Sequence, residues 1–370
     1  MTGAALLLGL ASLAAAPSGR VFLRAVETPL PLALVRDRES GENALAQNAA
    51  PGLALALGSA PGESVAPEAA KEAAPLVRVE RNSGLVRVTA PGGLLTEYRF
   101  SDADRPYFHP LLGPGGREMT RAFPMRDVAG EERDHPHHRS LWFAHGAVNG
   151  LDFWLGGENG PRIVATGIDG VVEGPVFGGF TARHEWRSPE GRVVLSDERV
   201  FRAFAVPEGA KLFDYAVTLR ATHGPVVFGD TKEGTMALRL AETLRLTGAV
   251  ASGRAVNARG VAGADVWGKR AEWIDYSGTV AGAAVGVAVF DHPSNPRHPT
   301  WWHARDYGLL AANPFGVHDF EKAAEGTGDF ALASGESARF LYGFYLHAGG
   351  PDEARVGAVH RAWAAATAER

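Results

Sequence analysis

The sequence has no cysteine. This absence excludes disulfide bonds, thiolate nucleophiles and every zinc or iron–sulfur site that depends on cysteine. Any metal would have to be held by histidine and carboxylate side chains. The sequence also lacks an excess of basic residues, because 37 lysines and arginines stand against 42 acidic residues and the net charge is -5. No positive field is available for a phosphate backbone, so nucleic acid is not an expected partner.

Long apolar runs are almost absent. The run from Ala4 to Leu13 is shorter than the run of about 20 residues that crosses a bilayer, and the small residues Ala14 to Ala16 follow it. This pattern is typical of a signal peptide, so we expect residues 1–16 to be removed and the protein to be secreted or periplasmic. A buried N-terminal strand and a misassigned start codon are the alternatives. No later stretch is apolar enough for a membrane span.

Helical periodicity is scarce before Pro351, whereas alternation of apolar and polar residues is common. In residues 211–222, Phe213, Tyr215 and Val217 fall on one face, which predicts a half-buried antiparallel strand. Further strands are expected at Leu76–Glu80, Gly84–Thr89, Leu94–Phe100, Val176–Trp186, Val193–Phe204, Met236–Leu246, Ala283–Phe290 and Arg339–His347. Only Pro351–Ala368 has the spacing of a helix. We therefore predict a mainly β protein, a large antiparallel β-sandwich with a C-terminal helix.

The stretch over residues 58–75 is rich in alanine, proline and small polar residues, and it predicts a linker that buries little surface. Short alternating runs precede it. We expect a small N-terminal β segment and linker at residues 17–75, and a β-sandwich domain at residues 76–370.

The densest group of reactive side chains lies between Asp134 and Trp154, in DHPHHRSLWFAHGAVNGLDFW. Imidazoles titrate near neutral pH and ligate metals, and indole rings offer flat faces for sugars. A core cluster with satisfied hydrogen bonds is the alternative. Four further polar and aromatic segments stand at 105–120 (RPYFHPLLGPGGREMT), 229–234 (GDTKEG), 267–278 (WGKRAEWIDYSG) and 290–315 (FDHPSNPRHPTWWHARDYGLLAANPF).

Together these motifs resemble those of the PmoA-like family of secreted bacterial proteins of unknown function. The similarity covers roughly residues 76 to 348. It implies a galactose-mutarotase-like supersandwich and supplies no settled activity, so the site residues are assigned from their chemistry.

We predict an exported carbohydrate-active enzyme of epimerase, lyase or hydrolase type that uses histidine and carboxylate acid–base chemistry. Its substrate would be a small carbohydrate or glycoside. The expected catalytic residues are His137, His138, Glu233, His303 and Asp306. The expected substrate-binding residues are His109, Arg139, Trp142, Lys232, Lys269, Asn295, Arg297, His298, Trp302, Arg305 and Asn313. Six groups are expected to line one pocket: His109, His137, His138, Glu233, Arg297 and His303.

Two other functions stay open, and no cofactor is assigned. On a strand, His135 and His137 would face one side, and with His145, His303 or Glu233 they would hold a divalent metal such as zinc, manganese or iron. Alternatively, the protein is a non-catalytic carbohydrate-binding module in which Trp142, Trp154, Trp301 and Trp302 serve as stacking platforms. Local turns and solvated charge would also account for GDTKEG and for Lys269–Arg270.

Overall fold

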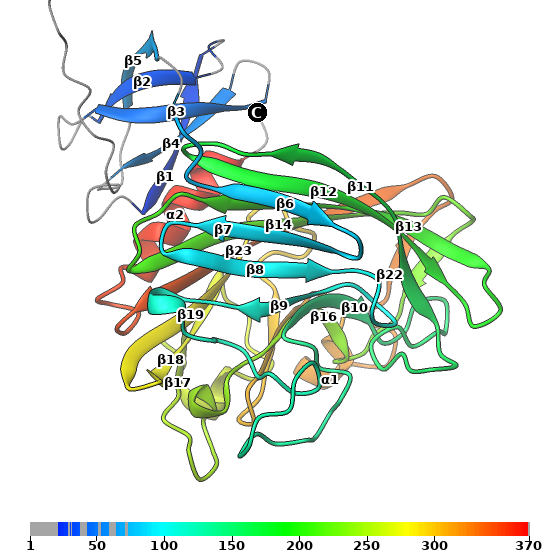
Figure 1. The fold of residues 1–370 in the computed structure, drawn as a ribbon. Helices are drawn as coiled ribbons and strands as arrows, with labels where there is room; N and C mark the ends of the chain where they lie inside the picture. The colour runs from blue at the N-terminus through cyan, green and yellow to red at the C-terminus, as the bar shows by residue number, and fades with distance from the viewer. Residues whose placement is uncertain are drawn as a thin grey trace, which may run out of the picture.

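In a computed structural model, the protein is described over residues 21–28, 30, 32–37, 43–50, 53–58, 64–70 and 73–368. Strands dominate these residues, as Figure 1 shows, which confirms the prediction of a mainly β protein with a C-terminal helix. The expected signal peptide, residues 1–16, lies outside the described residues. Within the described part of the chain, no helix is both long and apolar enough to cross a membrane.

Two eight-stranded antiparallel sheets form the body of the protein. The first has the order β20-β21-β16-β10-β9-β8-β7-β6. Its strands are β6 (Arg78–Asn82), β7 (Leu85–Ala90), β8 (Gly93–Arg99), β9 (Tyr107–Leu111), β10 (Leu141–His145), β16 (Gly234–Arg239), β20 (Trp301–Ala304) and β21 (Leu309–Asn313). Strands that are distant in the sequence, such as β10 and β16, are therefore neighbours in space.

The second sheet has the order β11-β12-β13-β14-β23-β19-β18-β17. Its strands are β11 (Arg162–Val172), β12 (Phe177–Arg187), β13 (Val193–Phe204), β14 (Ala210–Arg220), β17 (Arg254–Asn257), β18 (Trp273–Val280), β19 (Ala283–Asp291) and β23 (Ser337–Ala348). A small ribbon pairs β15 (Val226–Phe228) with β22 (Phe330–Leu332). The remaining elements are η1 (Pro114–Gly116), η2 (Glu242–Leu244), η3 (Gly263–Val266), α1 (Val317–Glu321) and α2 (Val356–Thr367).

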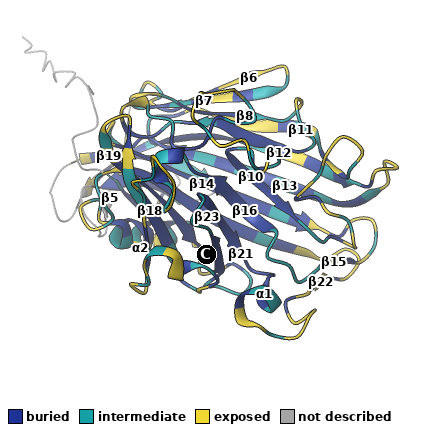
Figure 2. Cartoon of the chain, turned by 90° about the horizontal axis from the view of Figure 1, so that it is seen from below, coloured by how far each residue is buried: buried dark blue, intermediate teal, exposed yellow. Residues whose placement is uncertain are grey.

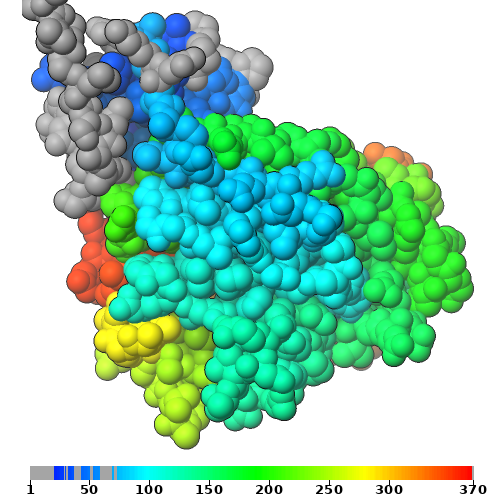
Figure 3. Space-filling view, viewed as in Figure 1, coloured from blue at the N-terminus to red at the C-terminus, as the bar shows by residue number. Residues whose placement is uncertain are grey.

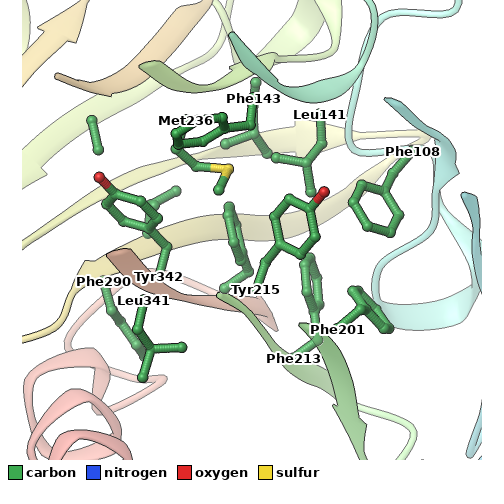
Figure 4. Close-up of a cluster of buried hydrophobic side chains, with 14 of the residues drawn as sticks. Phe108, Leu141, Phe143, Phe201, Phe213, Tyr215, Met236, Phe290, Leu341 and Tyr342 are labelled. Carbon is green, nitrogen blue, oxygen red and sulfur yellow. The ribbon is translucent and has the colours of Figure 1, made fainter. Parts of the chain in front are cut away.

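The core lies between the two large sheets. Phe108 of β9 meets Tyr215 of β14 with ring centroids 5.0 Å apart, and Phe143 of β10 meets Trp186 of β12 at 6.3 Å. Figure 4 shows Phe108, Phe143 and Tyr215 among the side chains of one buried cluster, and Figure 2 shows that much of the large strands is buried. Burial of this apolar surface away from water makes the main favourable contribution to the free energy that holds the two sheets together.

One face of β14 differs from the prediction. The alternation of residues 211–222 predicts a solvated face, yet nearly every residue of β14 is buried. Trp363 of helix α2 contacts that face, where its Nε1 donates to Asp214 Oδ2 at 3.3 Å. Arg202 makes two hydrogen bonds, of 2.9 and 2.7 Å, to the same carboxylate. Asp214, on the polar side of the strand, is thus buried with partners, whereas Arg220 at the end of the strand is exposed.

A third, five-stranded sheet precedes the sandwich, in the order β1-β4-β3-β2-β5. Its strands are β1 (Phe22–Glu27), β2 (Leu32–Asp37), β3 (Asn43–Ala50), β4 (Leu53–Gly58) and β5 (Ser64–Ala69). Figure 3 shows this sheet, in darker blue, at one end of the cyan face formed by β6 to β8. Strand β5 lies inside the stretch that was expected to be a linker. The buried Gln47 amide joins this sheet to β12 by donating to Phe177 O at 3.0 Å.

Candidate functional site

A pocket of about 530 Å³ lies beside four neighbouring strands, β10, β16, β21 and β20. This volume is in the range of small-molecule sites. The residues that line it come from the loops before and after β10, the loop before β16, strand β20 and the loop between β20 and β21. They are His135, His137, His138, Asp152, Trp154, Leu155, Lys232, Glu233, His303, Arg305 and Tyr307.

The histidine loop before β10 is held by the carboxylate of Asp134. Arg121 and Arg239, both with fully buried side chains, donate to Asp134 Oδ1, and the ring of His135 donates to its Oδ2 at 2.7 Å. Although partial burial opposes the charge of this carboxylate, Arg239 and the three hydrogen bonds keep its pKa well below the usual value. The loop is therefore anchored by a charged group at its first residue.

This loop is a turn, not a strand. His135 has a φ of 44° and Ser140 a φ of 51°, so the backbone folds back on itself, and His138 N donates to His135 O at 2.9 Å. His135 and His137 therefore do not share one side of a strand, as the metal hypothesis required. Among the described residues, no group of three or more histidine and carboxylate side chains is placed to hold a metal ion.

The ring of His138 is buried between His135 and Trp142, with centroid distances of 4.7 and 5.2 Å. Nη1 of Arg239 lies 3.4 Å from its Nδ1. A guanidinium group can only donate, so Nδ1 is the acceptor and the proton of the neutral ring sits on Nε2. Burial, together with the nearby His137 and Arg239, holds the pKa of His138 far below the usual value. His138 is thus a neutral ring that can offer an N–H to a ligand.

His137 and His303 are also held neutral at pH 7. Burial and the charge of Arg105 lower the pKa of His137 to about 4. Burial and the charge of Arg305 lower the pKa of His303 to about 3. The His303 residue is only 2% exposed, and within the described structure its Nδ1 is buried without a hydrogen-bond partner. A buried polar atom of this kind is costly unless a water or a ligand satisfies it.

Lys232 and Glu233 provide two of the accessible charges of the pocket, and the exposed Asp152 provides another. The side chains of Lys232 and Glu233 are 38% and 37% exposed, with Nζ 3.5 Å from Oε1. Their loop, GDTKEG, is well anchored. The carboxylate of Asp230 accepts from His318 N at 2.9 Å and from Gly328 N at 2.7 Å, and Asp319 accepts from Lys232 N at 2.8 Å. A plain turn is therefore an incomplete account of this motif, because its anchored backbone presents Lys232 and Glu233 to the pocket.

The tryptophans contribute less than expected. Trp154 lines the pocket, with its ring 5.7 Å from His138. Trp142 packs behind His138 and is buried. Trp302 is fully buried and donates to Ala271 O at 3.0 Å, and Trp301 donates to Glu321 at 2.7 Å. Three of the four proposed stacking platforms thus belong to the packing of the protein.

Four of the six residues expected to share one pocket, namely His137, His138, Glu233 and His303, do so. Two do not. His109 lies in a separate pocket of about 440 Å³, where its Nδ1 is 3.7 Å from Glu118 Oε1. Arg297 donates to the backbone carbonyls of Pro314, Gly328 and Asp329 at 2.6 to 3.1 Å, so it braces the loops behind the site.

Other predicted site residues also have structural partners away from the pocket. The carboxylate of Asp306 accepts from Thr247 at 3.3 Å. Asn295 and His298 both bind Asp291, at 2.7 and 2.8 Å. Asn313 donates to Thr231 O at 2.9 Å and so supports the loop of Lys232 and Glu233 from behind. Lys269 is exposed to solvent outside the pocket.

Besides Lys232, two of the predicted binding residues lie at or beside the pocket. Arg305 lines it, with its guanidinium 5.6 Å from the centre of the Tyr307 ring. Arg139 lies 5.5 Å from the centre of the Tyr107 ring and lines a neighbouring pocket.

Sequence reasoning missed Arg239, which stands behind the whole site. It contacts Asp134 and His138, and its guanidinium lies 4.7 Å from the centre of the Tyr307 ring. One signal was available. Arg239 is a single charge in the apolar run MALRL, and a buried charge needs partners.

Comparison with known proteins identifies the family of this chain and finds two solved structures with low similarity to it. A model described as "Family of unknown function (DUF6807)" matches residues 85–361, and that description carries no PmoA label. No curated protein matches the chain significantly. A solved protein in the glycosyl hydrolase family 38 from Enterococcus faecalis has 12% sequence identity and a TM-score of 0.34, covering 93% of this chain.

This chain spans only 41% of the length of that glycosyl hydrolase family 38 protein. A GalM/aldose epimerase homologue from C. elegans has 9% identity and a TM-score of 0.28, covering 75% of this chain and 100% of its own. At these scores, neither likeness bears on the chemistry of the pocket.

Proposed function

The chain belongs to the DUF6807 family of unknown function, and from that premise we propose that its pocket binds a small carbohydrate and exchanges protons with it. The single observation that carries this proposal is the meeting of three neutral imidazoles with the Glu233 carboxylate around one pocket of about 530 Å³. These groups come from loops far apart in the sequence. Packing alone does not require them to meet.

The chemistry of the pocket suits a hydroxyl-rich ring. The ring of Trp154, which lines the pocket, offers apolar surface for the C–H face of a sugar. The charged side chains of Lys232, Glu233 and Arg305 offer hydrogen bonds to its hydroxyl groups. An apolar wall combined with a few polar groups is the usual composition of a specific small-molecule site.

We assign different roles to the carboxylate and the imidazoles. Two carboxylates line the pocket, and Asp152 accepts hydrogen bonds from the backbone N–H groups of Trp154 and Leu155. Glu233 is therefore the carboxylate that would take a proton from a hydroxyl group or from a carbon of the ring. His138 and His303 have lowered pKa values, so at pH 7 they act as neutral hydrogen-bond donors or acceptors instead of cationic acids. A neutral imidazole N–H aimed at an oxygen stabilises the charge that develops there when the proton leaves.

The test is an NMR screen of purified protein against glycosides, 3-keto-glycosides and free sugars, which reports anomerisation, elimination and hydrolysis together. We expect one class of compound to react. Glu233→Gln should lower the rate by about 10²- to 10⁴-fold, the usual contribution of a positioned acid or base. The matched control is Glu325→Gln, which changes an exposed glutamate away from the pocket and should leave the rate unchanged.

Two results would contradict the proposal. Sugar binding without turnover of any compound would replace the enzyme by a non-catalytic carbohydrate-binding module. Absence of both binding and turnover across the panel would remove the carbohydrate assignment itself.

We also propose that the protein is exported. The support is the apolar run and small residues at positions 4–16. Fractionation of the native host with N-terminal sequencing tests this. Protein found only in the cytoplasm would contradict export, and an intact Met1 on exported protein would exclude cleavage.

A further inference from the structure

A second pocket, of about 390 Å³, lies directly beside the first. Its lining residues are Asp104, Pro136, His137, Arg139, Leu155, Gly156, Gly157, Glu158 and Arg162. His137 and Leu155 line both pockets, so the two hollows meet along these side chains. A ligand long enough to pass His137 would contact both.

The wall between the two pockets is fixed in place. Asp152 Oδ1 accepts from the backbone N–H groups of Trp154 and Leu155, at 3.0 and 2.8 Å. The buried Arg105 donates to Phe153 O at 3.0 Å and to His137 O at 2.7 Å. Both segments that form the wall are therefore tied to one guanidinium group. A preformed wall lowers the cost of ordering the site when a ligand binds.

Leu155 is 55% exposed, although it is a large apolar side chain at the junction of two hollows. An exposed apolar residue on such a rim gains stability when a ligand covers it. Across the junction, Gly157 has a φ of 109°, and a Cβ added there would meet nothing within 4 Å. The second pocket therefore has open space next to an apolar edge.

The charges of the two pockets balance. The first is lined by Asp152 and Glu233 together with Lys232 and Arg305. The second is lined by Asp104 and Glu158 together with Arg139 and Arg162. Neither pocket has an excess charge that would select an anionic or a cationic ligand. This balance favours an uncharged molecule whose hydroxyl groups can both donate and accept hydrogen bonds.

We propose that the natural ligand is a neutral two-part glycoside, a disaccharide or a sugar joined to an apolar group, and not a free monosaccharide. One sugar ring occupies the pocket of Glu233 and His303, and the second part covers Leu155 in the neighbouring pocket. The bond that joins the two parts then passes His137, the ring shared by both pockets. This inference rests on the proposed carbohydrate function of the first pocket.

The experiment is a calorimetric comparison of free neutral monosaccharides with their phenyl glycosides and with disaccharides, using wild type and Leu155→Ala. We expect the two-part compounds to bind more tightly. Leu155→Ala should weaken their binding by about tenfold, as expected for the loss of partial burial of a leucine, and should change monosaccharide binding less than twofold. The matched control is Val250→Ala, because Val250 is also 55% exposed but lies outside both pockets. It should change neither affinity.

The outcomes separate the two proposals. Equal affinity for monosaccharides and two-part compounds, with no effect of Leu155→Ala on either, would overturn the two-part ligand and leave the carbohydrate pocket standing. Weaker binding that is equal for both classes in Leu155→Ala would also overturn it, because Leu155 would then serve the first pocket alone. No binding of any compound would overturn both proposals.

Discussion

Nη1 of Arg239 lies 3.4 Å from Nδ1 of His138. Arg239 is in the buried strand β16 and His138 is in the loop before β10, so this contact joins two neighbouring strands behind the pocket. It also decides which nitrogen of His138 carries the proton, because arginine cannot accept. The same guanidinium holds the Asp134 carboxylate at 2.7 Å. One arginine thus positions both the loop and the ring.

His137 and His303 should remain neutral well below pH 7. We expect NMR titration of histidine side chains to show His303 with a pKa near 3 and His137 with a pKa near 4. Burial is the largest cause in both. A pKa above 5 for His303 would show that its ring is solvated and would remove the neutral-donor role.

The same shifts predict how stability depends on pH. Because the folded pKa of His303 lies below the unfolded value of about 6.5, the unfolded state binds this proton more readily. The free energy of unfolding should therefore decrease as the pH falls from about 6.5 toward the folded value. His303→Gln should reduce that slope in urea unfolding between pH 7 and pH 5. An unchanged slope would contradict the shift.

Asp134→Asn should destabilise the protein by about 2 kcal/mol at pH 7, because two buried arginines lose a charged acceptor. The folded pKa of Asp134 is lowered, so its contribution is present above the unfolded value of about 3.9 and is lost as the pH falls below that value. The difference between wild type and variant should therefore shrink below about pH 4. Chemical denaturation at pH 7 and pH 3 measures it.

Asp127→Asn is the control for that experiment. Asp127 pairs with Arg133, and both side chains are largely exposed, so removing the pair should change stability little at any pH. Equal losses in both variants would mean that Asp134 behaves as a surface charge.

His303→Asn and Glu233→Gln should each remove most of the activity, and the double variant should lose little more. Groups that act on one substrate as a unit are strongly non-additive. Turnover of the reactive compound measures the effect, and the exposed His223→Asn, outside the pocket, should keep full activity. Additive losses in the double variant would separate the two residues into different steps.

His109→Gln should leave ligand binding and turnover unchanged, because His109 faces a separate pocket beside Glu118. The measurement is the affinity for the best ligand of the screen. A loss of affinity greater than about threefold with an unchanged free energy of unfolding would place His109 in the working site after all.

Local patterns were sufficient for several strands but not for all of the long ones, because no strand was predicted at β11 (Arg162–Val172). Alternation predicts β13 and β19 closely, because each has large apolar residues on the face toward the core. The segment WGKRAEWIDYSG reads as a polar loop, yet its second half forms β18. Asp275 is buried there because His347, two strands away, binds it at 2.7 Å, and Gly286 between them leaves room for the ring. A partner on another strand is invisible in a local pattern.

Only part of the site could be predicted from the sequence, again because contacts between distant segments are invisible in a local pattern. His137, His138, Glu233 and His303 stand out as polar residues in stiff, aromatic segments, and these segments do converge. Arg297, Asn295 and His298 share that composition, but their partners are backbone carbonyls and Asp291. The residues around them are similar in kind, so composition could not separate a ligand site from a braced loop. The strand order β20-β21-β16-β10 brings the residues of the ligand site together, and this order cannot be read from composition.

The same strand order determines the stage of folding at which the pocket forms. His138 and His303 become neighbours only after β10, β16, β21 and β20 have paired in sequence, and such long-range pairings form late and slowly. A partly folded chain would have no complete pocket. Any ligand of the site therefore binds the finished sheet alone, and by mass action it would raise the melting temperature of the whole sandwich.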